Sequence, residues 1–220
     1  LMRHAQSITD AAFQHMLTFI KPGLTEKEIR TELENFMFSN GADSLAFGSI
    51  VASGPNTANP HAVPSDRVVQ RGDFVLMDYG AGYCDYRSDM TRTVVVGEPT
   101  PEQLDLYALV RRTHEECAAA VHAGVEGNDI FKLSRKIIGD AGYGDYYNHG
   151  LGHGVGIDIH ELPNFNRSKN IIEVGSVVTM EPGVYLPGVG GVRLEDYGVV
   201  TENGYEPFTK TPHDLHVIDC

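Results

Sequence analysis

The sequence has 220 residues, 41% of them hydrophobic, and a formal net charge of −13 at pH 7. A chain of this length and composition is typical of one large globular domain or two small ones. The acidic balance, with no cluster of Lys and Arg, excludes a surface for nonspecific nucleic-acid binding, so we expect no nucleic-acid partner. No apolar run approaches the roughly 18 residues of a membrane span, so we expect no membrane partner either.

The cysteines indicate the redox compartment. Cys84, Cys117 and Cys220 are an odd and scattered set, which argues against a disulfide framework and for a reducing environment. We therefore expect a cytoplasmic location. The chain begins with Leu1 inside a predicted helix, which suggests that it is part of a longer protein.

The first half of the chain is predicted to run from two helices into strands. Residues 1–20 place apolar side chains on one helical face, and Thr25 with Glu28 forms a capping box for a second helix that ends near Gly41. Strand patterns follow at residues 49–53, 74–79 and 90–96.

The last two of these strands flank a connection rich in Gly and Tyr, which predicts a hairpin. A hairpin centred near Tyr83 and Cys84 would place Asp78 opposite Asp89 on the same face. Two carboxylates in that position repel each other, and a cation between them would relieve the repulsion. The alternative is a pair of solvated aspartates near a turn, where Asp is common.

The second half repeats this order. A capped helix is predicted from Thr100 to about His122 and another from residue 127 or 128 to about 142, followed by strands at 176–180 and 191–201. A faint repeat at an offset of 101 residues matches Gly23 with Gly124 and Gly41 with Gly142. It favours, weakly, a pseudo-symmetric fold with a site between its halves.

Residues 148–163 hold three histidines among glycines, and so many glycines predict loop or strand rather than helix. His153 lies at the centre of this stretch, where the small neighbours let the backbone approach an ion, and we expect it to be a metal ligand. One imidazole among carboxylates is a common set for a divalent transition metal. The carboxylates expected to join it are Asp78, Asp89, Glu181 and Glu195.

The charge of this set indicates how many ions it holds. Four carboxylates carry −4, which balances two divalent cations, whereas one cation would leave buried negative charge unmatched. Two ions that share a bridging water would supply hydroxide at neutral pH. The oxygen-rich ligands favour manganese or cobalt over a structural zinc.

Other residues are expected to face the substrate. His149, His160 and His61, the last in a polar loop at 54–64, can donate hydrogen bonds to a developing oxyanion, although each can also be a structural histidine. Glu181 precedes Pro182 at a strand end and can pass a proton to a leaving amine.

Arg193 lies two positions before Glu195 on a predicted strand, so both point to one face. It can orient a carboxylate or hold a substrate terminus, and a structural ion pair is an equal alternative. The remaining histidines are expected to be solvated: His4, His15, His114, His122, His213 and His216.

Five segments in this order resemble the Xaa-Pro peptidases, prolidase and aminopeptidase P, within the wider methionine aminopeptidase and creatinase superfamily: HAVPSDR, LMDYGAGYCDYRSDMTRT, HGLGHGVGIDIHELP, MEPGVY and GVRLEDYGVVT. The resemblance implies an α+β fold with pseudo-two-fold symmetry, the pita-bread fold, in which a curved, mostly antiparallel sheet is backed by helices.

The resemblance also implies a function for each part of the predicted site. Asp78, Asp89, His153, Glu181 and Glu195 would hold two divalent ions, Mn²⁺ or Co²⁺ with Zn²⁺ possible, with Asp89 and Glu195 bridging and Glu181 handling protons. The pocket lining for short proline-containing peptides would be His61, His149, His160 and Arg193.

Xaa-Pro peptidases usually carry a further N-terminal domain that supports a homodimer, so residues 1–220 are expected to be the catalytic domain of a longer chain. Two other functions stay open. One is a methionine aminopeptidase-like enzyme, and the other is a non-catalytic peptide-binding module on the same fold. The sequence does not separate dipeptidase from aminopeptidase, because that depends on the room beyond the proline.

Overall fold

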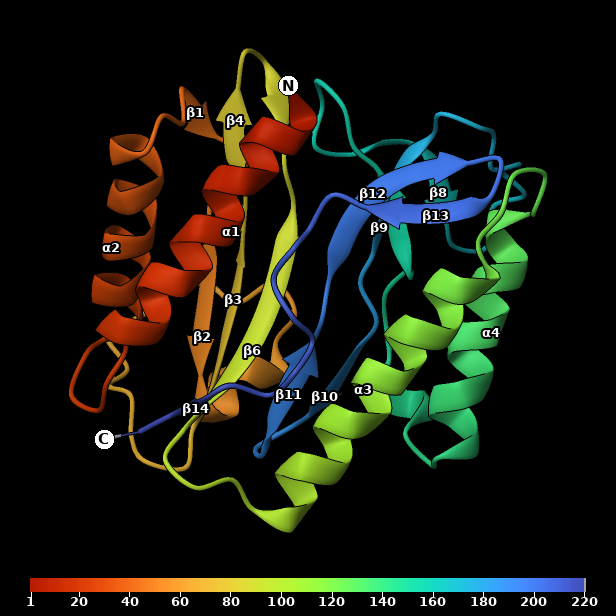
Figure 1. Ribbon diagram of the computed structural model, residues 1–220. Coiled ribbons are helices and arrows are strands. Elements are labelled where there is room, and N and C mark those ends of the chain that lie inside the picture. Colours follow the sequence, from red (N-terminus) through yellow and green to blue (C-terminus); the bar gives the residue numbers. More distant parts are fainter. Residues whose placement is uncertain (220) are drawn as a thin grey trace.

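The computed structural model describes residues 1–219, so Cys220 lies outside the described part. Two similar halves follow one another, each with a pair of helices and then strands (Figure 1). The first half contains α1 (Met2–Phe19), α2 (Glu26–Ser39), β1 (Ser44–Leu45), β2 (Ile50–Ser53), the 3₁₀ helix η1 (Gly54–Ala58), β3 (Phe74–Tyr79), β4 (Ala81–Tyr83), β5 (Tyr86–Arg87) and β6 (Met90–Val96). The second half contains α3 (Pro101–Ala120), α4 (Gly127–Asp140), the 3₁₀ helix η2 (Gly144–Tyr146), β7 (Gly152–Gly154), β8 (Glu161–Phe165), β9 (Val177–Met180), β10 (Gly183–Leu186), β11 (Gly190–Arg193), β12 (Asp196–Thr201), β13 (Gly204–Pro207) and β14 (Val217–Ile218).

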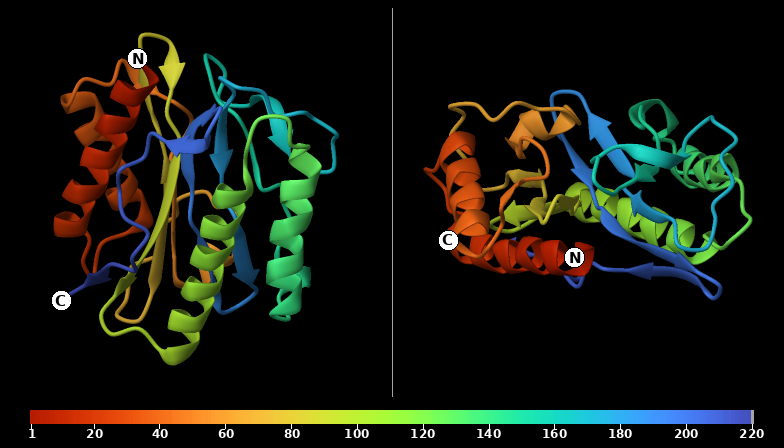
Figure 2. Two further views of the ribbon diagram at one scale, coloured as in Figure 1. Left: turned by 45° about the vertical axis from the view of Figure 1, so that its right-hand side comes forward. Right: turned by 90° about the horizontal axis from the view of Figure 1, so that it is seen from above.

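The strands form sheets in the orders β14-β6-β3-β2, β13-β12-β9-β7-β8, β1-β4-β5 and β10-β11. Nearly all neighbouring strands are antiparallel, and β14 pairs with β6 in parallel. Figures 1 and 2 show α1 and α2 beside the first sheet and α3 and α4 beside the strands of the second half. No helix among residues 1–219 combines the length and the apolar character that a membrane crossing requires.

The predicted helix starts are confirmed. Thr25 and Thr100 each accept a hydrogen bond from the backbone N–H three residues later, and Glu28 and Gln103 accept one from the backbone N–H of the cap. Both capping boxes satisfy amide groups that the first helical turn leaves without a partner.

The structure bears out the repeat at an offset of 101 residues. Gly23 and Gly124 have φ of +98° and +87°, and Gly41 and Gly142 have +100° and +88°. These left-handed conformations suit glycine, which lacks a Cβ. The amides of Gly23 and Gly124 donate to the carbonyls of residues 69 and 172, so each helix pair is fastened to its half in the same way.

The hairpin prediction needs a correction. The turn residues are Cys84 and Asp85, both with positive φ, so the centre lies one residue later than predicted. Asp78 consequently pairs with Thr91, and its predicted pairing with Asp89 is wrong by two positions. Because side chains alternate with a period of two, this error does not change the face on which a residue lies.

The predicted strand at 191–201 is also wrong as a single element. β11 ends at Arg193 and pairs with β10, whereas β12 begins at Asp196 and pairs with β9 and β13. Between them, Glu195 forms an isolated antiparallel bridge with Thr91 of β6. Arg193 and Glu195 therefore do not share one strand, because the chain passes from one sheet to another at this point.

This passage joins the two halves. The Thr93 hydroxyl donates to the carbonyl of Arg193 over 3.0 Å, and the amide of Glu195 donates to the carbonyl of Thr91 over 3.1 Å. An apolar cluster that includes Phe74, Val95, Val110, Val192 and Leu194 packs across the same junction. We call residues 91–93 with 193–196 the seam.

The expectation for the remaining histidines holds only in part. His4 and His122 are exposed, but His114 in α3 is 2% exposed, and burial lowers its pKa to about 4. His213 is also partly buried. The sequence pattern missed His114 because α3 packs on the second half along a face that includes this position. Of the cysteines described, Cys84 is exposed and Cys117 buried, and both are free thiols.

Glu26, the first residue of α2, is a buried carboxylate that organises the loop bearing His61. Its Oε1 accepts hydrogen bonds from the amide and hydroxyl of Ser53 and from Asn56, and its Oε2 accepts two from Ser65. Five donors converge on one side chain that is 1% exposed. A buried carboxylate is tolerated when its oxygens are satisfied in this way.

Replacing this carboxylate should therefore destabilise the first half. In Glu26→Gln an amide NH₂ replaces one acceptor and faces donors, so the free energy of unfolding should fall by roughly 2–3 kcal/mol. Chemical denaturation at neutral pH measures it. The exposed Glu98→Gln is the matched control and should change stability by less than about 0.5 kcal/mol. Equal stability of both variants would contradict the role of Glu26.

Candidate metal centre and active site

A cavity of ≈ 310 Å³ lies where the halves meet, and residues from both halves line it. The lining includes every residue for which the sequence predicted a role: His61, Asp78, Asp89, His149, His153, His160, Glu181, Arg193 and Glu195. Phe47, Ile50 and Ile159 add apolar surface to the same cavity.

Strand ends position the acidic residues. Asp78 is the next-to-last residue of β3 and Asp89 immediately precedes β6. Glu181 immediately follows β9 and Glu195 immediately precedes β12. All four residues therefore lie at or next to the end of a strand, and their carboxylates line the cavity.

His153 is the middle residue of the short strand β7. Its Nδ1 lies 3.0 Å from the carbonyl of Gly154, which can only accept, so Nδ1 carries the proton and Nε2 has a free lone pair. Nε2 lies 3.6 Å from Asp89 Oδ2 and 3.5 Å from Glu181 Oε1. A backbone carbonyl that fixes the tautomer in this way is typical of metal-binding histidines.

Potential ligand atoms are close together here. One atom each from Asp89, His153 and Glu195 lie within 4.8 Å of one another. Glu195 is held in place by the Thr91 hydroxyl, which donates to its Oε2 over 2.6 Å. These distances fit a group that surrounds one or more cations.

Asp78 supplies a further oxygen. Its Oδ2 accepts a hydrogen bond from Arg193 Nη2 over 2.6 Å, which forms a buried ion pair. Its Oδ1 is buried and has no hydrogen-bond partner within residues 1–219. An orphaned carboxylate oxygen is costly in a protein interior, and a cation would satisfy it.

The carboxyl groups of the cavity are electrostatically frustrated without a cation. Burial, followed by the neighbouring charges of Asp78 and Glu181, raises the pKa of Asp89 well above its usual value. Burial, followed by Asp89, does the same to the pKa of Glu195. Burial also raises the pKa of Glu181 to about 7. Such shifts arise when like charges share a dry site, and they indicate that the residues fit divalent metal.

Arg193 is fully engaged by the protein. Besides Asp78, it donates to the Tyr185 hydroxyl over 2.9 Å, to the Thr91 hydroxyl over 3.1 Å and to the carbonyl of Pro60 over 3.3 Å. It is 2% exposed. Its partner is a carboxylate of the cavity, so the contact fits both an ion pair and an arginine that orients a carboxylate.

The histidines differ in what their rings contact. His149 Nδ1 donates to the carbonyl of Gly150, so its Nε2 accepts from the Tyr185 hydroxyl over 2.8 Å. Burial, followed by the charge of Arg193, lowers the pKa of His149 to about 3, which keeps the ring neutral. His160 and His61 are exposed at the rim, and the His160 ring lies 4.3 Å from that of His153, centroid to centroid.

Sequence reasoning missed two residues that support the site. Tyr185 connects His149 with Arg193, and Thr91 connects Arg193 with Glu195. Both lie inside the segments that carry the family resemblance, MEPGVY and DMTRT, so their proximity to Glu181 and Asp89 in the sequence was the available signal.

Comparison with known proteins shows which proteins share this sequence and fold. The Xaa-Pro dipeptidase of Pyrococcus furiosus is 41% identical over 216 residues, which make up 98% of this chain and 62% of that protein. A solved Xaa-Pro dipeptidase from Bacillus anthracis has a TM-score of 0.95 at 46% identity, covering 98% of this chain and 61% of that one. An X-Pro aminopeptidase from Thermotoga maritima has a TM-score of 0.97 at 38% identity, covering 99% and 62%.

The chain thus spans about 62% of the length of the curated relatives it matches. Its fold is the pita-bread fold of the solved prolidases, as the sequence resemblance implied. Residues 1–202 match the family described as metallopeptidase family M24, and the chain belongs to that family.

Proposed function

We propose that this cavity is the active centre of a metal-dependent peptidase that hydrolyses the peptide bond before proline in Xaa-Pro peptides. The observation that carries the proposal is the convergence of four carboxylates and one correctly oriented imidazole on a single cavity. The solved relatives from Bacillus anthracis and Thermotoga maritima are named as an Xaa-Pro dipeptidase and an X-Pro aminopeptidase, which supports the substrate class.

In this proposal Asp78, Asp89, His153, Glu181 and Glu195 hold two divalent ions. Four ionised carboxylates and the Arg193 guanidinium sum to −3, so one divalent cation would leave the buried cavity negative and two would not. The oxygen-rich set favours Mn²⁺ or Co²⁺, with Zn²⁺ as a further candidate. When bound, such ions lower the pKa of water and polarise a carbonyl group.

The chain's own residues then perform the remaining tasks. Glu181, which lines the cavity directly after β9, takes a proton and returns it to the leaving proline nitrogen. His160 and His61 stand at the rim and donate hydrogen bonds to substrate oxygens. His149 is held by the Gly150 carbonyl and Tyr185, so its ring shapes the wall, and it donates to substrate only after it leaves Tyr185 and carries a proton on Nε2.

We further propose that residues 1–220 form the catalytic unit of a longer cytoplasmic protein that dimerises in its full-length form. The share of the relatives that the chain covers supports the longer protein, and the free thiols of Cys84 and Cys117 support the reducing compartment. A methionine aminopeptidase-like activity and a non-catalytic peptide-binding role are the competing functions.

The substrate assignment is tested with peptides that differ only around the scissile bond. With added Mn²⁺ or Co²⁺ we expect hydrolysis of Ala-Pro dipeptide or Ala-Pro-Ala, and at least about 100-fold lower kcat/KM on Met-Ala peptides. The ratio of dipeptide to tripeptide turnover then separates dipeptidase from aminopeptidase. Preference for Met-Ala would favour the methionine aminopeptidase alternative, and binding without turnover would favour the non-catalytic one.

Metal retention and activity should fail together when a ligand is removed. Asp89→Asn and Glu195→Gln keep the shape of the side chain but remove a negative oxygen donor. We expect at least one ion fewer per chain and a loss in kcat/KM of about 10³-fold or more. The reason is that the variant loses several kcal/mol of electrostatic stabilisation of the transition state. Metal analysis and steady-state kinetics measure both. The exposed Glu202→Gln is the control, and near-normal turnover of either ligand variant would refute the assignment.

The raised carboxyl pKa values predict how metal-free protein responds to pH. A carboxyl group whose pKa is higher in the folded chain keeps its proton there at a pH at which the unfolded chain has lost it. As pH rises through the folded-state pKa, the buried group has to ionise, and the folded chain loses stability relative to the unfolded chain. Thermal unfolding of metal-depleted protein should thus move to lower temperature between about pH 7.5 and about pH 8.5, where histidines are largely neutral in both states. Added Mn²⁺ should abolish the trend. Stability that is constant or rises over this window without metal would contradict it.

A further inference from the structure

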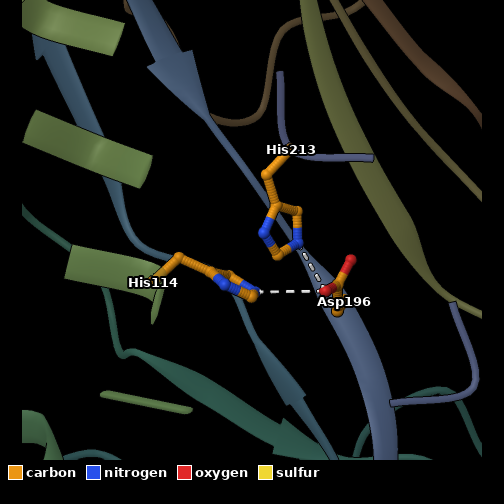
Figure 3. A group of neighbouring side chains, drawn as sticks. All are labelled: His114, Asp196 and His213. Atoms are coloured by element: carbon orange, nitrogen blue, oxygen red, sulfur yellow. Dashed lines mark hydrogen bonds and ion pairs between the residues drawn. The ribbon is translucent and has the colours of Figure 1, made fainter. Parts of the chain in front are cut away.

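A second group of possible metal ligands lies outside the cavity. His114 of α3, Asp196 at the start of β12 and His213 of the C-terminal segment converge at one point (Figure 3). His213 Nε2 lies 2.7 Å and His114 Nε2 3.6 Å from the same oxygen, Asp196 Oδ2. The three potential ligand atoms lie within 4.8 Å of one another.

His114 is the unusual member of this group. The residue is 2% exposed, and neither ring nitrogen has a hydrogen-bond partner in the part of the chain that the structure describes. Buried imidazole nitrogens normally have a hydrogen-bond partner, because burial removes their hydrogen bonds to water and a nitrogen without a protein partner regains none. Figure 3 shows both imidazoles turned toward the carboxylate of Asp196, so Nε2 of His114 is aimed at a point that the other two also face.

Two imidazoles and one carboxylate are a ligand set of Zn²⁺. Ligand atoms about 2.0 to 2.2 Å from a tetrahedral zinc stand roughly 3.3 to 3.6 Å apart, so the separation between His114 and Asp196 fits and that of His213 needs an outward shift of roughly 0.6 Å. His213 is partly exposed, which leaves a route for the ion and for a water as fourth ligand. We propose that His114, Asp196 and His213 form an additional zinc site with three protein ligands.

The local charges favour this metal over a harder cation. Arg92 Nη2 donates to Asp196 Oδ1 over 2.7 Å, which neutralises the carboxylate but leaves Oδ2 toward the histidines. Glu115 Oε1 lies 3.9 Å from His213 Nδ1 and contributes a negative charge nearby. With little net negative charge of its own, the site depends on nitrogen ligands, which suit zinc rather than magnesium or calcium.

The site is separate from the active centre, although Asp196 follows Glu195 directly. None of its three residues lines the catalytic cavity. Neighbouring residues of an extended chain point in opposite directions, so Glu195 faces the cavity and Asp196 faces α3. Bound zinc would fasten the segment around His213 to α3 and β12, and Arg92 already holds this segment through the carbonyl of Thr211.

The direct test uses the wild-type protein, crystallised after incubation with zinc alone. Anomalous scattering measured on either side of the zinc edge should give a peak bounded by His114 Nε2, Asp196 Oδ2 and His213 Nε2. Absence of this peak, with zinc present in the catalytic cavity, would overturn the proposal and leave an ion-pair network in its place.

Substitution tests the same point in solution. His213→Gln, on the partly exposed member, should lower the zinc content after desalting by one ion per chain and remove the peak, while zinc in the catalytic cavity stays. His122→Gln changes an exposed histidine just beyond the end of α3 and should keep the full zinc content. Equal zinc content in His213→Gln and wild type would equally reject the site.

Discussion

The burial of like charges in one cavity is the constraint that the surrounding structure has to meet. Four carboxylates from separate strand ends face each other where water is largely excluded, and burial with mutual repulsion raises the pKa values of Asp89, Glu181 and Glu195. An arrangement this unfavourable for the bare protein persists only because the surrounding fold is stable enough to hold it. The ion pair of Asp78 with Arg193 and the hydrogen bond from Thr91 to Glu195 relieve part of this cost, and bound cations would relieve the rest.

The seam explains how distant parts of the sequence meet with the required accuracy. Glu195 lies between two strands of different sheets and bridges to Thr91, so its position is set by both halves at once. Arg92 strengthens this junction by donating to the carbonyl of Glu195 over 2.7 Å while it pairs with Asp196. The same short segment therefore supports the cavity on one side and the histidine pair on the other.

Much of this organisation was predictable from local chemistry. Capping boxes at Thr25 and Thr100 located two helix starts, and the glycine pairs at an offset of 101 residues indicated the two halves. The errors lay where tertiary contacts decide. The turn at residues 84 and 85 fixed the hairpin register, the exchange of sheets after Arg193 divided a predicted strand, and helix packing buried His114. None of these follows from the hydrophobic pattern of its own segment.

The internal repeat also applies to the acidic residues. Asp78 near the end of β3 corresponds to Glu181 just after β9, and Asp89 directly before β6 corresponds to Glu195 directly before β12. Each half thus donates an equal pair of carboxylates. His153 has no such counterpart, because β7 pairs with β9 as β2 pairs with β3, and β2 contains no histidine. Two ions held by such a frame, as proposed, would be chemically unequal, because the five residues offer a single nitrogen ligand. They would differ in metal preference and in the order in which a chelator extracts them.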